Sequence, residues 1–507
     1  MTIETLHKWQ RFMLLGLIIT LPLTTIPKAF QIPGLGSSLS DYFFIIGFCL
    51  IMYEFIKYKF IIDKKIKNFF IIYVLWQFIC LIHGLYTYQF SELLTLDQIS
   101  KLEIILDKLN FGEINIDEVL IIKCWLFIRS SRDILFFNNE VFLIIFYIYH
   151  LYKNNFNKAF SDIRKAILYL ILIMGIYSFI ELLWLKLSLN FATEMLISIN
   201  PFLYDPVSNH GWWPPILWGN QLRSICQEPS FFGIISILSI PILWSYVFEG
   251  KRRKWIYLLI FYFSFMIFAT NARTAIVVTG GELFLLVLLC FIIKNKVYIK
   301  KTIAIVLITI LAFSANLIDY KSVFNVSNED EAYLTSIEDY MENNVSSLAD
   351  KDSRSNRARL SNLVANINTI IEYPILGVGT GLKDAYIDKN LPDFAYDDYE
   401  VMERWHKFMV EEGVLKSGYP ALNKYADIAV QNGVVGLLIY LSVVIYLLYN
   451  IFKYKNLLMK DFRIICLIIS MIGLLMAQIS SAYLINCNGI VWGLLYCVIE
   501  SIKHKEF

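Results

Sequence analysis

The chain has 507 residues, of which 57% are hydrophobic, and its mean hydropathy is +0.56. Charged residues make up only 17% and cluster between long apolar runs, which excludes an ordinary soluble domain. The net charge of +2 excludes the strongly basic balance of nucleic-acid-binding proteins, so no nucleic-acid partner is expected. Composition therefore predicts an all-α, polytopic membrane protein.

Long apolar runs recur along the chain, and each predicts one transmembrane helix. A helix needs about 20 mostly apolar residues to cross the hydrocarbon core of a bilayer. No small-residue cleavage site follows the first run, so we predict a retained anchor there. About twelve spans are expected, at residues 10–27, 41–60, 69–87, 133–152, 166–188, 229–248, 255–270, 274–293, 302–318, 428–450, 464–482 and 484–501.

Basic clusters in the short loops predict the orientation, because such loops carry an excess of Lys and Arg on the cytoplasmic side. All clusters fall on one side if both termini are cytoplasmic and the number of spans is even. This consistency supports twelve spans, with a single span between residues 88 and 153. Residues 118–135 are ambiguous, since they predict either an interfacial helix or a shift of the fourth span.

Three longer segments are then predicted on the extracytoplasmic side. Residues 88–117 are amphipathic and are expected on the membrane surface, whereas residues 189–228 are rich in aromatic residues and proline. Residues 319–427 form a large acidic periplasmic loop, and loops of that size usually carry function. The chain is thus divided into spans 1–9 (residues 1–318), this loop, and spans 10–12 (residues 428–507).

Cysteines and acidic residues give no metal signature. The eight cysteines lie mostly inside apolar runs and form no CxxC pair, so neither a disulfide framework nor a zinc site is predicted. The neighbouring Asp397 and Asp398 lie in an acidic loop, where such pairs usually face water. No metal and no cofactor are expected.

The stretch RSICQEPSFFG, residues 223–233, places two charges at the start of an apolar run. Pro229 suits the first turn of a helix, and Glu228 suits its N-terminal end. One interpretation is that Glu228 caps this helix and pairs with Arg223. The other is that both residues line a pocket at the outer membrane face, and the two interpretations are compatible.

The stretch ATNARTAIVVTGG, residues 269–281, lies at the outer end of a very short hairpin between two spans. It carries Asn271 and Arg273. Outer loops need no basic residue, so Arg273 is either a snorkelling or salt-bridged side chain, or part of a site on the same face as Arg223.

Residues 352–381 predict an amphipathic helix inside the large loop, ending before Pro374, with its apolar stripe on the buried face. Arg354, Arg357 and Arg359 fall within six residues, and Arg357 is expected along the buried face. They predict either an anion site, because guanidinium groups bind phosphate bidentately, or a solvated face. The stripe consists of Leu360, Leu363, Val364, Ile367, Ile370 and Ile371.

Asn423 and Gln431 are polar residues just before the tenth span, and they are either site residues or ordinary interfacial groups. His210, in the aromatic segment, and His406, in the large loop, are the candidate histidine bases. A single loop histidine is more often neither a base nor a ligand.

These four features, in this order, resemble the O-antigen polymerase and O-antigen ligase superfamily of bacterial envelope enzymes. The resemblance covers about residues 223–440, and each motif alone is loose. The matching residues are Arg223 with Glu228-Pro229-Ser230, Asn271-Ala272-Arg273-Thr274, Arg359 with the helix to Pro374 and the following Gly-Val-Gly run, and Asn423 followed by Asn432-Gly433-Val434-Val435-Gly436-Leu437-Leu438.

The resemblance implies a GT-C-like glycosyltransferase of the bacterial inner membrane that acts on the outer face. Its donor would be a glycan on undecaprenyl diphosphate, and its acceptor a second lipid-linked repeat unit (polymerase) or lipid A-core (ligase). Ligases typically carry a histidine where this chain has Leu422, which favours a polymerase and leaves the base unassigned. Undecaprenyl-diphosphate-linked oligosaccharides and membrane lipids are the expected partners, and a chain-length regulator protein is left open.

In the mechanism we expect, negative charge builds on the leaving diphosphate, so the site needs cations there. Glu228 is the first choice for the base that accepts the proton of the acceptor hydroxyl, and His406 is the second. A lipid-linked oligosaccharide flippase is the alternative of a different class, disfavoured because no internal repeat is visible. The groups expected to bind the diphosphate or the substrate are Arg223, Arg273, Arg357, Arg359 and Asn423.

Overall fold

The computed structural model describes the chain in ten stretches, all helical or irregular, and these described stretches contain no β-strand. The all-α prediction is therefore confirmed. The stretches are residues 2–32, 35–94, 99, 118–153, 155–203, 214–249, 254–318, 320, 354–415 and 418–503. The predicted surface helix within 88–117 lies almost entirely outside them, as does His210.

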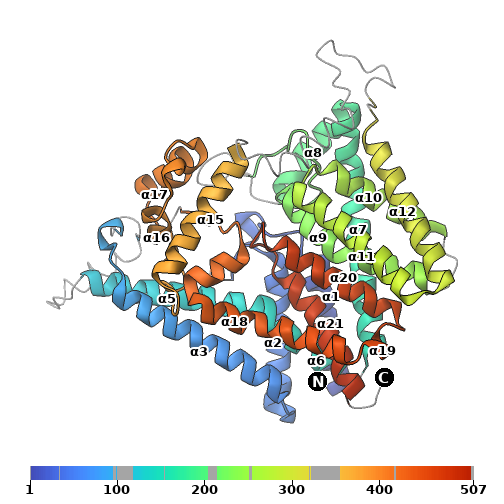
Figure 1. Cartoon of the computed structure of the whole chain (residues 1–507), viewed down its shortest axis with the longest axis horizontal. Coiled ribbons are helices and arrows are strands. Elements are labelled where there is room, and N and C mark those ends of the chain that lie inside the picture. The colour runs from blue at the N-terminus through green and yellow to red at the C-terminus, as the bar shows by residue number, and fades with distance from the viewer. Residues whose placement is uncertain are drawn as a thin grey trace.

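Long apolar helices dominate the architecture (Figure 1). The first group is α1 (Ile3–Ile19), α2 (Leu39–Tyr58), α3 (Lys64–Thr87), α5 (Glu118–Asn138), α6 (Ile144–Tyr152), α7 (Phe156–Leu187), α8 (Asn190–Leu203), α9 (Pro229–Phe248), α10 (Lys254–Ala269), α11 (Arg273–Ile293) and α12 (Lys296–Asn316). The second group is α15 (Arg354–Glu372), α16 (Lys383–Lys389), α17 (Lys407–Glu412), α18 (Lys424–Lys453), α19 (Lys455–Leu458), α20 (Phe462–Ala477) and α21 (Asn486–Lys503). Short helical turns are η1 (Lys28–Phe30), η2 (Ser91–Leu93), η4 (Asn139–Leu143), η6 (Asp393–Ala395) and η7 (Val401–His406).

Each of the twelve predicted spans coincides with a helix. Eight of these helices are long and apolar enough to cross a membrane: α2, α3, the continuous α5–α6 helix, α7, α9, α11, α12 and α18. Helices α10 and α20 are apolar but shorter, and α1 and α21 fall in neither group. The chain is a polytopic membrane protein, whereas twelve crossings and the division into parts stay predictions.

The ambiguous stretch 118–135 belongs to the same helix as the fourth span. Helices α5 and α6 join through the π-helical turn η4 into one apolar helix of 35 residues, Glu118–Tyr152. At 1.5 Å per residue this helix is about 52 Å long, well beyond the ~30 Å hydrocarbon core. Because residues 118–135 continue into the fourth span within one helix, they add no separate crossing.

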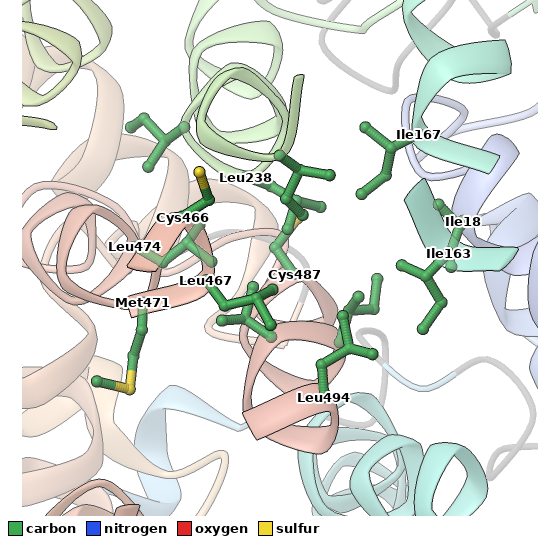
Figure 2. Close-up of a cluster of buried hydrophobic side chains, with 14 of the residues drawn as sticks. Ile18, Ile163, Ile167, Leu238, Cys466, Leu467, Met471, Leu474, Cys487 and Leu494 are labelled. Atoms are coloured by element: carbon green, nitrogen blue, oxygen red, sulfur yellow. The ribbon is translucent and has the colours of Figure 1, made fainter. Parts of the chain in front are cut away.

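The core of the bundle is built around α9, α20 and α21 (Figure 1). Almost every residue of α9 is buried, as expected for a helix that is apolar on all sides. In Figure 2 Leu238 of α9 lies among side chains of α7, α20 and α21, including Ile167, Leu467 and Leu494. Helices α11 and α12 instead expose large apolar side chains, as lipid-facing helices do.

Ion pairs show which helix ends lie together. Lys65 Nζ, at the start of α3, contacts Glu500 Oε1, near the end of α21, at 2.9 Å. The basic cluster around Lys57–Lys67 and the end of α21 thus share one end of the bundle, in agreement with the predicted orientation. The side of the membrane on which this end lies stays a prediction.

Helix α18 breaks at Gly433, whose φ of 68° and ψ of 174° are accessible almost only to glycine. Residues 374–379, which include the Gly-Val-Gly run, pack into this break and make hydrogen bonds that the helix cannot. Val378 N donates to Val430 O at 2.8 Å, and Val434 N donates to Pro374 O at 2.8 Å. This run is therefore the joint between the bundle and the lobe formed by α15, α16 and α17, which we call the α15–α17 lobe.

Helix α15 occupies the predicted position, but the predicted buried face was wrong. Leu360, Ile367 and Ile371 of the apolar stripe are exposed, Ile371 at 72%. The helix packs through small residues, among them Ala358 and Ala365, because their short side chains allow close approach of the backbones. The polar members of the buried face bond within the helix, which lowers the cost of burying them: Ser361 donates to Arg357 O, Asn366 to Asn362 O and Thr369 to Ala365 O.

Candidate functional site

A tight turn places Arg273 at the first position of α11. Asn271 adopts a left-handed φ of 48°, which asparagine tolerates better than most residues, and its Nδ2 donates to Asn220 O at 3.0 Å. A cation at a helix N-terminus opposes the helix dipole, so local helix stability does not favour Arg273 there. Its position therefore indicates a role beyond the stability of the helix.

Helix α15 brings a second arginine to the same place. Arg273 Nη1 donates to Asn356 Oδ1 at 3.0 Å, and Arg359 lies one turn further along α15. Desolvation by the surrounding protein lowers the pKa of Arg359, and the positive charge of Arg273 lowers it further, although its side chain still reaches solvent. Two like charges held near each other form a cationic centre that an anion would stabilise.

The loop between α20 and α21 connects the two arginines. Arg359 Nη1 donates to Ser480 O at 3.3 Å, and Ser480 Oγ shares a hydrogen bond of 2.8 Å with Thr274 Oγ1. Ser480 thus touches both the helix that carries Arg273 and the side chain of Arg359. The contact spans 121 residues of sequence.

Glu228 lies at the N-cap position of α9, and Pro229 is the first helical residue, as predicted. Its side chain makes no capping bond to the backbone; instead it accepts a hydrogen bond from Ser230 Oγ at 2.8 Å. Burial raises the pKa of the Glu228 carboxyl, while the nearby charge of Arg359 opposes this rise. Glu228 is therefore an acceptor for protons beside the cationic centre.

Tyr483 completes the set that we call the candidate site: Glu228, Arg273, Arg359, Ser480 and Tyr483. Its ring lies 5.2 Å from that of Phe231, centroid to centroid. The surrounding protein and the negative charge of Glu228 raise the pKa of the Tyr483 hydroxyl, so the hydroxyl keeps its proton and can donate a hydrogen bond.

A buried charge network lies next to the candidate site. Lys383 Nζ contacts Asp427 Oδ1 at 2.6 Å, and Lys424 Nζ contacts Asp427 Oδ2 at 3.4 Å. Burial alone would lower the pKa of Lys383, but Asp427 and Asp384 raise it above its ordinary value. Lys383 and Asp427 also act electrostatically on Tyr483, so this network borders the site from the side of α16 and α18.

Arg223 is placed differently from the other predicted arginines. It is 1% exposed, and its two terminal nitrogens donate to Pro215 O at 2.8 Å and Ile216 O at 2.6 Å. The buried Glu181 accepts from the backbone N–H groups of Arg223 and Ser224. These contacts make Arg223 part of the framework that holds the segment 214–228 on α7, and the expected contact with a diphosphate stays a prediction.

Arg357 and Asn423 also contact other groups. Arg357 Nη2 donates to Phe394 O at 3.0 Å and lies 3.5 Å from Asp397 Oδ2, so it ties α15 to the turn η6. Asn423 Oδ1 accepts from Ala426 N at 3.0 Å and caps α18. A substrate-binding role for either residue stays a prediction.

His406 lies inside the α15–α17 lobe. Its Nδ1 is 2.7 Å from Asp388 Oδ1, which also accepts a hydrogen bond from the Tyr419 hydroxyl. The carboxylate fixes the ring as in a catalytic histidine pair, but the described contacts of His406 connect it to α16 and not to Arg273 or Arg359.

Four residues at or next to the candidate site were not predicted from the sequence: Ser480, Tyr483, Asn356 and Lys383. Ser480 and Tyr483 lie in a loop, and Asn356 and Lys383 lie on helices of the large predicted loop. None of the four belongs to a recognisable motif. Only the approach of the α20–α21 loop to α11 and α15 brings them together. The polar pair Ser480-Ser481, near the end of the predicted span 464–482, was an available signal.

The apolar helices that can cross a membrane define a polytopic membrane protein. Its candidate site is polar and lies where α9 and α11 begin. Residues 256–441 match the family model described as O-antigen ligase, and this match supports the resemblance to the O-antigen polymerase and ligase superfamily. The family implies a membrane enzyme of the glycosyltransferase type, and the match does not distinguish polymerase from ligase. The matched region contains Arg273 and Arg359 but neither Glu228 nor Ser480. No curated protein matches the chain.

Proposed function

We propose that the protein transfers a glycan from undecaprenyl diphosphate to a second lipid-linked repeat unit, as an O-antigen polymerase does, at the outer face of the bacterial inner membrane. The observation that carries this proposal is the meeting of Arg273 and Arg359 beside Glu228. Three separate parts of the chain supply these residues: the start of α9, the start of α11 and α15.

The two arginines suit a diphosphate leaving group. Their guanidinium groups can each donate two parallel hydrogen bonds to phosphate oxygens, and the N-terminus of α11 adds a positive helix dipole. Negative charge on the diphosphate would remove the repulsion between Arg273 and Arg359. The interaction strengthens as the sugar–diphosphate bond breaks, so it would stabilise the transition state more than the bound substrate.

Glu228 suits the role of general base. The acceptor hydroxyl oxygen forms a bond to C1 of the donor sugar, the C1–oxygen bond to the diphosphate breaks, and the bonding electrons leave with the diphosphate. The hydroxyl proton passes to the Glu228 carboxylate, whose raised pKa makes it a better proton acceptor than an ordinary glutamate. Tyr483 is placed to hold the acceptor by a hydrogen bond. His406 remains the second candidate base.

The residue before Asn423 supports a polymerase over a ligase. Ligases of this superfamily typically carry a histidine at this position, whereas this chain has Leu422. Leucine can neither accept nor donate a proton, so this position would contribute no acid–base group.

The test uses the purified protein in lipid nanodiscs with one defined undecaprenyl-diphosphate-linked repeat unit. We expect lipid-linked products longer by whole repeat units, together with released undecaprenyl diphosphate. Arg273→Ala and Arg359→Ala should strongly reduce both products, while Arg132→Ala, at an exposed surface ion pair with Asp133, should not. Products that form only with lipid A-core as acceptor would identify a ligase. Transbilayer movement of the lipid without bond cleavage would identify a flippase and overturn the proposal.

A further inference from the structure

Three potential metal ligands meet near the start of α1. His7 of α1, Glu54 of α2 and His150 of α6 place one ligand atom each within 4.8 Å of one another. His7 Nε2 lies 2.9 Å from Glu54 Oε1, and His150 Nε2 lies 3.0 Å from Glu54 Oε2. The residues are 47 and 96 positions apart from Glu54, so the fold and not the local sequence creates the cluster.

The cluster is held in place by its surroundings. Glu54 is 3% exposed, and the ring of His150 packs at 4.1 Å, centroid to centroid, against Phe60. Gln10 Nε2 donates to Glu54 Oε2 at 2.7 Å. A charged carboxylate so deeply buried needs positive charge beside it, because desolvation of an isolated charge is costly. The ring of His7, which is partly exposed, leaves one side open to solvent.

One polar atom of the cluster is unsatisfied. Gln10 Oε1 is buried and has no hydrogen-bond partner among the described residues. Hydrogen bonds from the two histidines would satisfy Glu54 but would leave this oxygen alone, and a buried acceptor without a donor costs about 1–3 kcal/mol. A water molecule bound to a metal ion at the cluster would supply the missing donor.

The donor set fits a transition metal. Two imidazole nitrogens and one carboxylate oxygen, with a water in the fourth position, form a known set for Zn²⁺. With bonds of about 2.0–2.1 Å, neighbouring ligand atoms in a tetrahedral site lie about 3.3 Å apart. Each histidine lies 2.9 or 3.0 Å from a different Glu54 oxygen, and the three ligand atoms lie within 4.8 Å of one another, so side-chain rotations could bring them to this spacing.

We propose that His7, Glu54 and His150 bind a divalent transition-metal ion of the Zn²⁺ type, which clamps α1 to α2 and α6. The site is separate from the candidate site. From His7 to Ile19 the helix extends about 18 Å, and beyond it Thr25 bonds to Gln227, the neighbour of Glu228. The metal would thus stabilise the opposite end of the bundle, and this proposal does not depend on the proposed glycosyl transfer.

The experiment measures Zn²⁺ binding by the purified full-length protein in detergent, after removal of metals with a chelator. A chromophoric zinc indicator competes for the metal, and the thermal unfolding temperature is recorded with and without Zn²⁺. Wild type should bind one Zn²⁺ per chain and unfold at a higher temperature when it is present. Co²⁺ in place of Zn²⁺ should give the visible absorption of a tetrahedral complex.

The variants separate the site from chance binding. His7→Ala, at a partly exposed position, should fold and should weaken Zn²⁺ binding by at least roughly 10- to 100-fold. His406→Ala is the matched control, because it removes a histidine that is paired with the Asp388 carboxylate but belongs to no three-ligand cluster among the described residues. The proposal is overturned if wild type binds no Zn²⁺, or if His7→Ala and His150→Ala bind it as tightly as wild type does.

Discussion

The segment 214–228 and the corner where α11 meets α15 both carry arginines that the sequence marks as candidates, yet the two regions hold them differently. In the segment, Arg223 is buried and bonded to two backbone carbonyls. At the corner, Arg273 and Arg359 lie near each other, and their positive charges repel. Hydrogen bonds from a buried guanidinium to the backbone carbonyls of its own segment are typical of structural residues, whereas two like charges close together are typical of a site for a charged ligand.

Glu228 belongs to both regions, because it ends the segment 214–228 and faces Arg359. Its interaction with Arg359, and not its position in the sequence, therefore assigns Glu228 to the site. Substitutions in the two regions should therefore have different effects on turnover and stability.

Glu228→Gln should reduce turnover by about 10²–10⁴, the usual contribution of a general base. The base works as the carboxylate, so wild-type turnover should fall as the pH drops through the Glu228 pKa, which burial places above its ordinary value. The variant should lose this acidic limb, as shown by initial rates measured across pH. Glu400→Gln is the control. Glu400 also acts electrostatically on Arg359, but it comes from the segment between α16 and α17 and not from the start of α9. A normal acidic limb in Glu228→Gln would move the base to another residue, with His406 as the next candidate.

Arg273→Ala should reduce turnover by about 10²–10³ without unfolding the protein, which is the range for loss of one group that stabilises transition-state charge. Arg273→Lys keeps the charge but not the planar fork, so we expect only partial recovery. Both are measured as initial rates with thermal unfolding recorded in parallel. Equal rates for wild type and Arg273→Ala would remove the distinction between the two regions.

Arg223→Met should give the opposite pattern. It leaves two backbone carbonyls without their donors, and each unsatisfied group costs about 1–3 kcal/mol. We expect a lower unfolding temperature in detergent, with turnover per folded molecule close to that of wild type. A stable protein with a rate loss as large as that of Arg273→Ala would instead place Arg223 at the diphosphate, as the sequence alone suggested.

Gly433→Ala should lower stability by about 1–3 kcal/mol, because its backbone conformation excludes a side chain. An added Cβ would also collide with Ile375 O, which lies in the joint to the α15–α17 lobe. Since α15 carries Arg359, turnover should fall together with stability. Gly280→Ala is the control, since a Cβ there meets nothing within 4 Å and alanine favours a helix. Unfolding temperature and turnover of both variants check the expectation.

Much of the fold could be predicted from the sequence. All twelve predicted spans coincide with helices, because hydrophobic length and the positions of Lys and Arg depend on the local sequence. The start of α9 at Pro229 followed from the preference of proline for the first helical turn. The break at Gly433 could not be predicted, since a single glycine in an apolar run is compatible with a continuous helix.

The candidate site was predictable only in part. Motifs indicated Glu228, Arg273 and Arg359, but not which arginines meet. The periodicity of α15 favoured burial of Leu360 and Ile367, whereas close packing through small residues buries the opposite face. Because that rotation decides which side chains face α11, the grouping of Arg359 with Arg273, and the exclusion of Arg357 from it, requires the tertiary structure.

Ser480→Ala should have the smallest effect. It removes the hydroxyl bond to Thr274 but keeps the backbone carbonyl that accepts from Arg359, so the expected loss is about 0.5–1.5 kcal/mol. If Ser480 aligns the two arginines, this loss should be seen in turnover, up to about tenfold, and little in the unfolding temperature. A cycle with Thr274→Val tests the point, because two residues that act through one bond should lose no more together than either does alone. Additive losses in the double variant would show that Ser480 and Thr274 act separately. The corner would then keep its two arginines, but its alignment would depend on Asn356 and the packing of α15 alone.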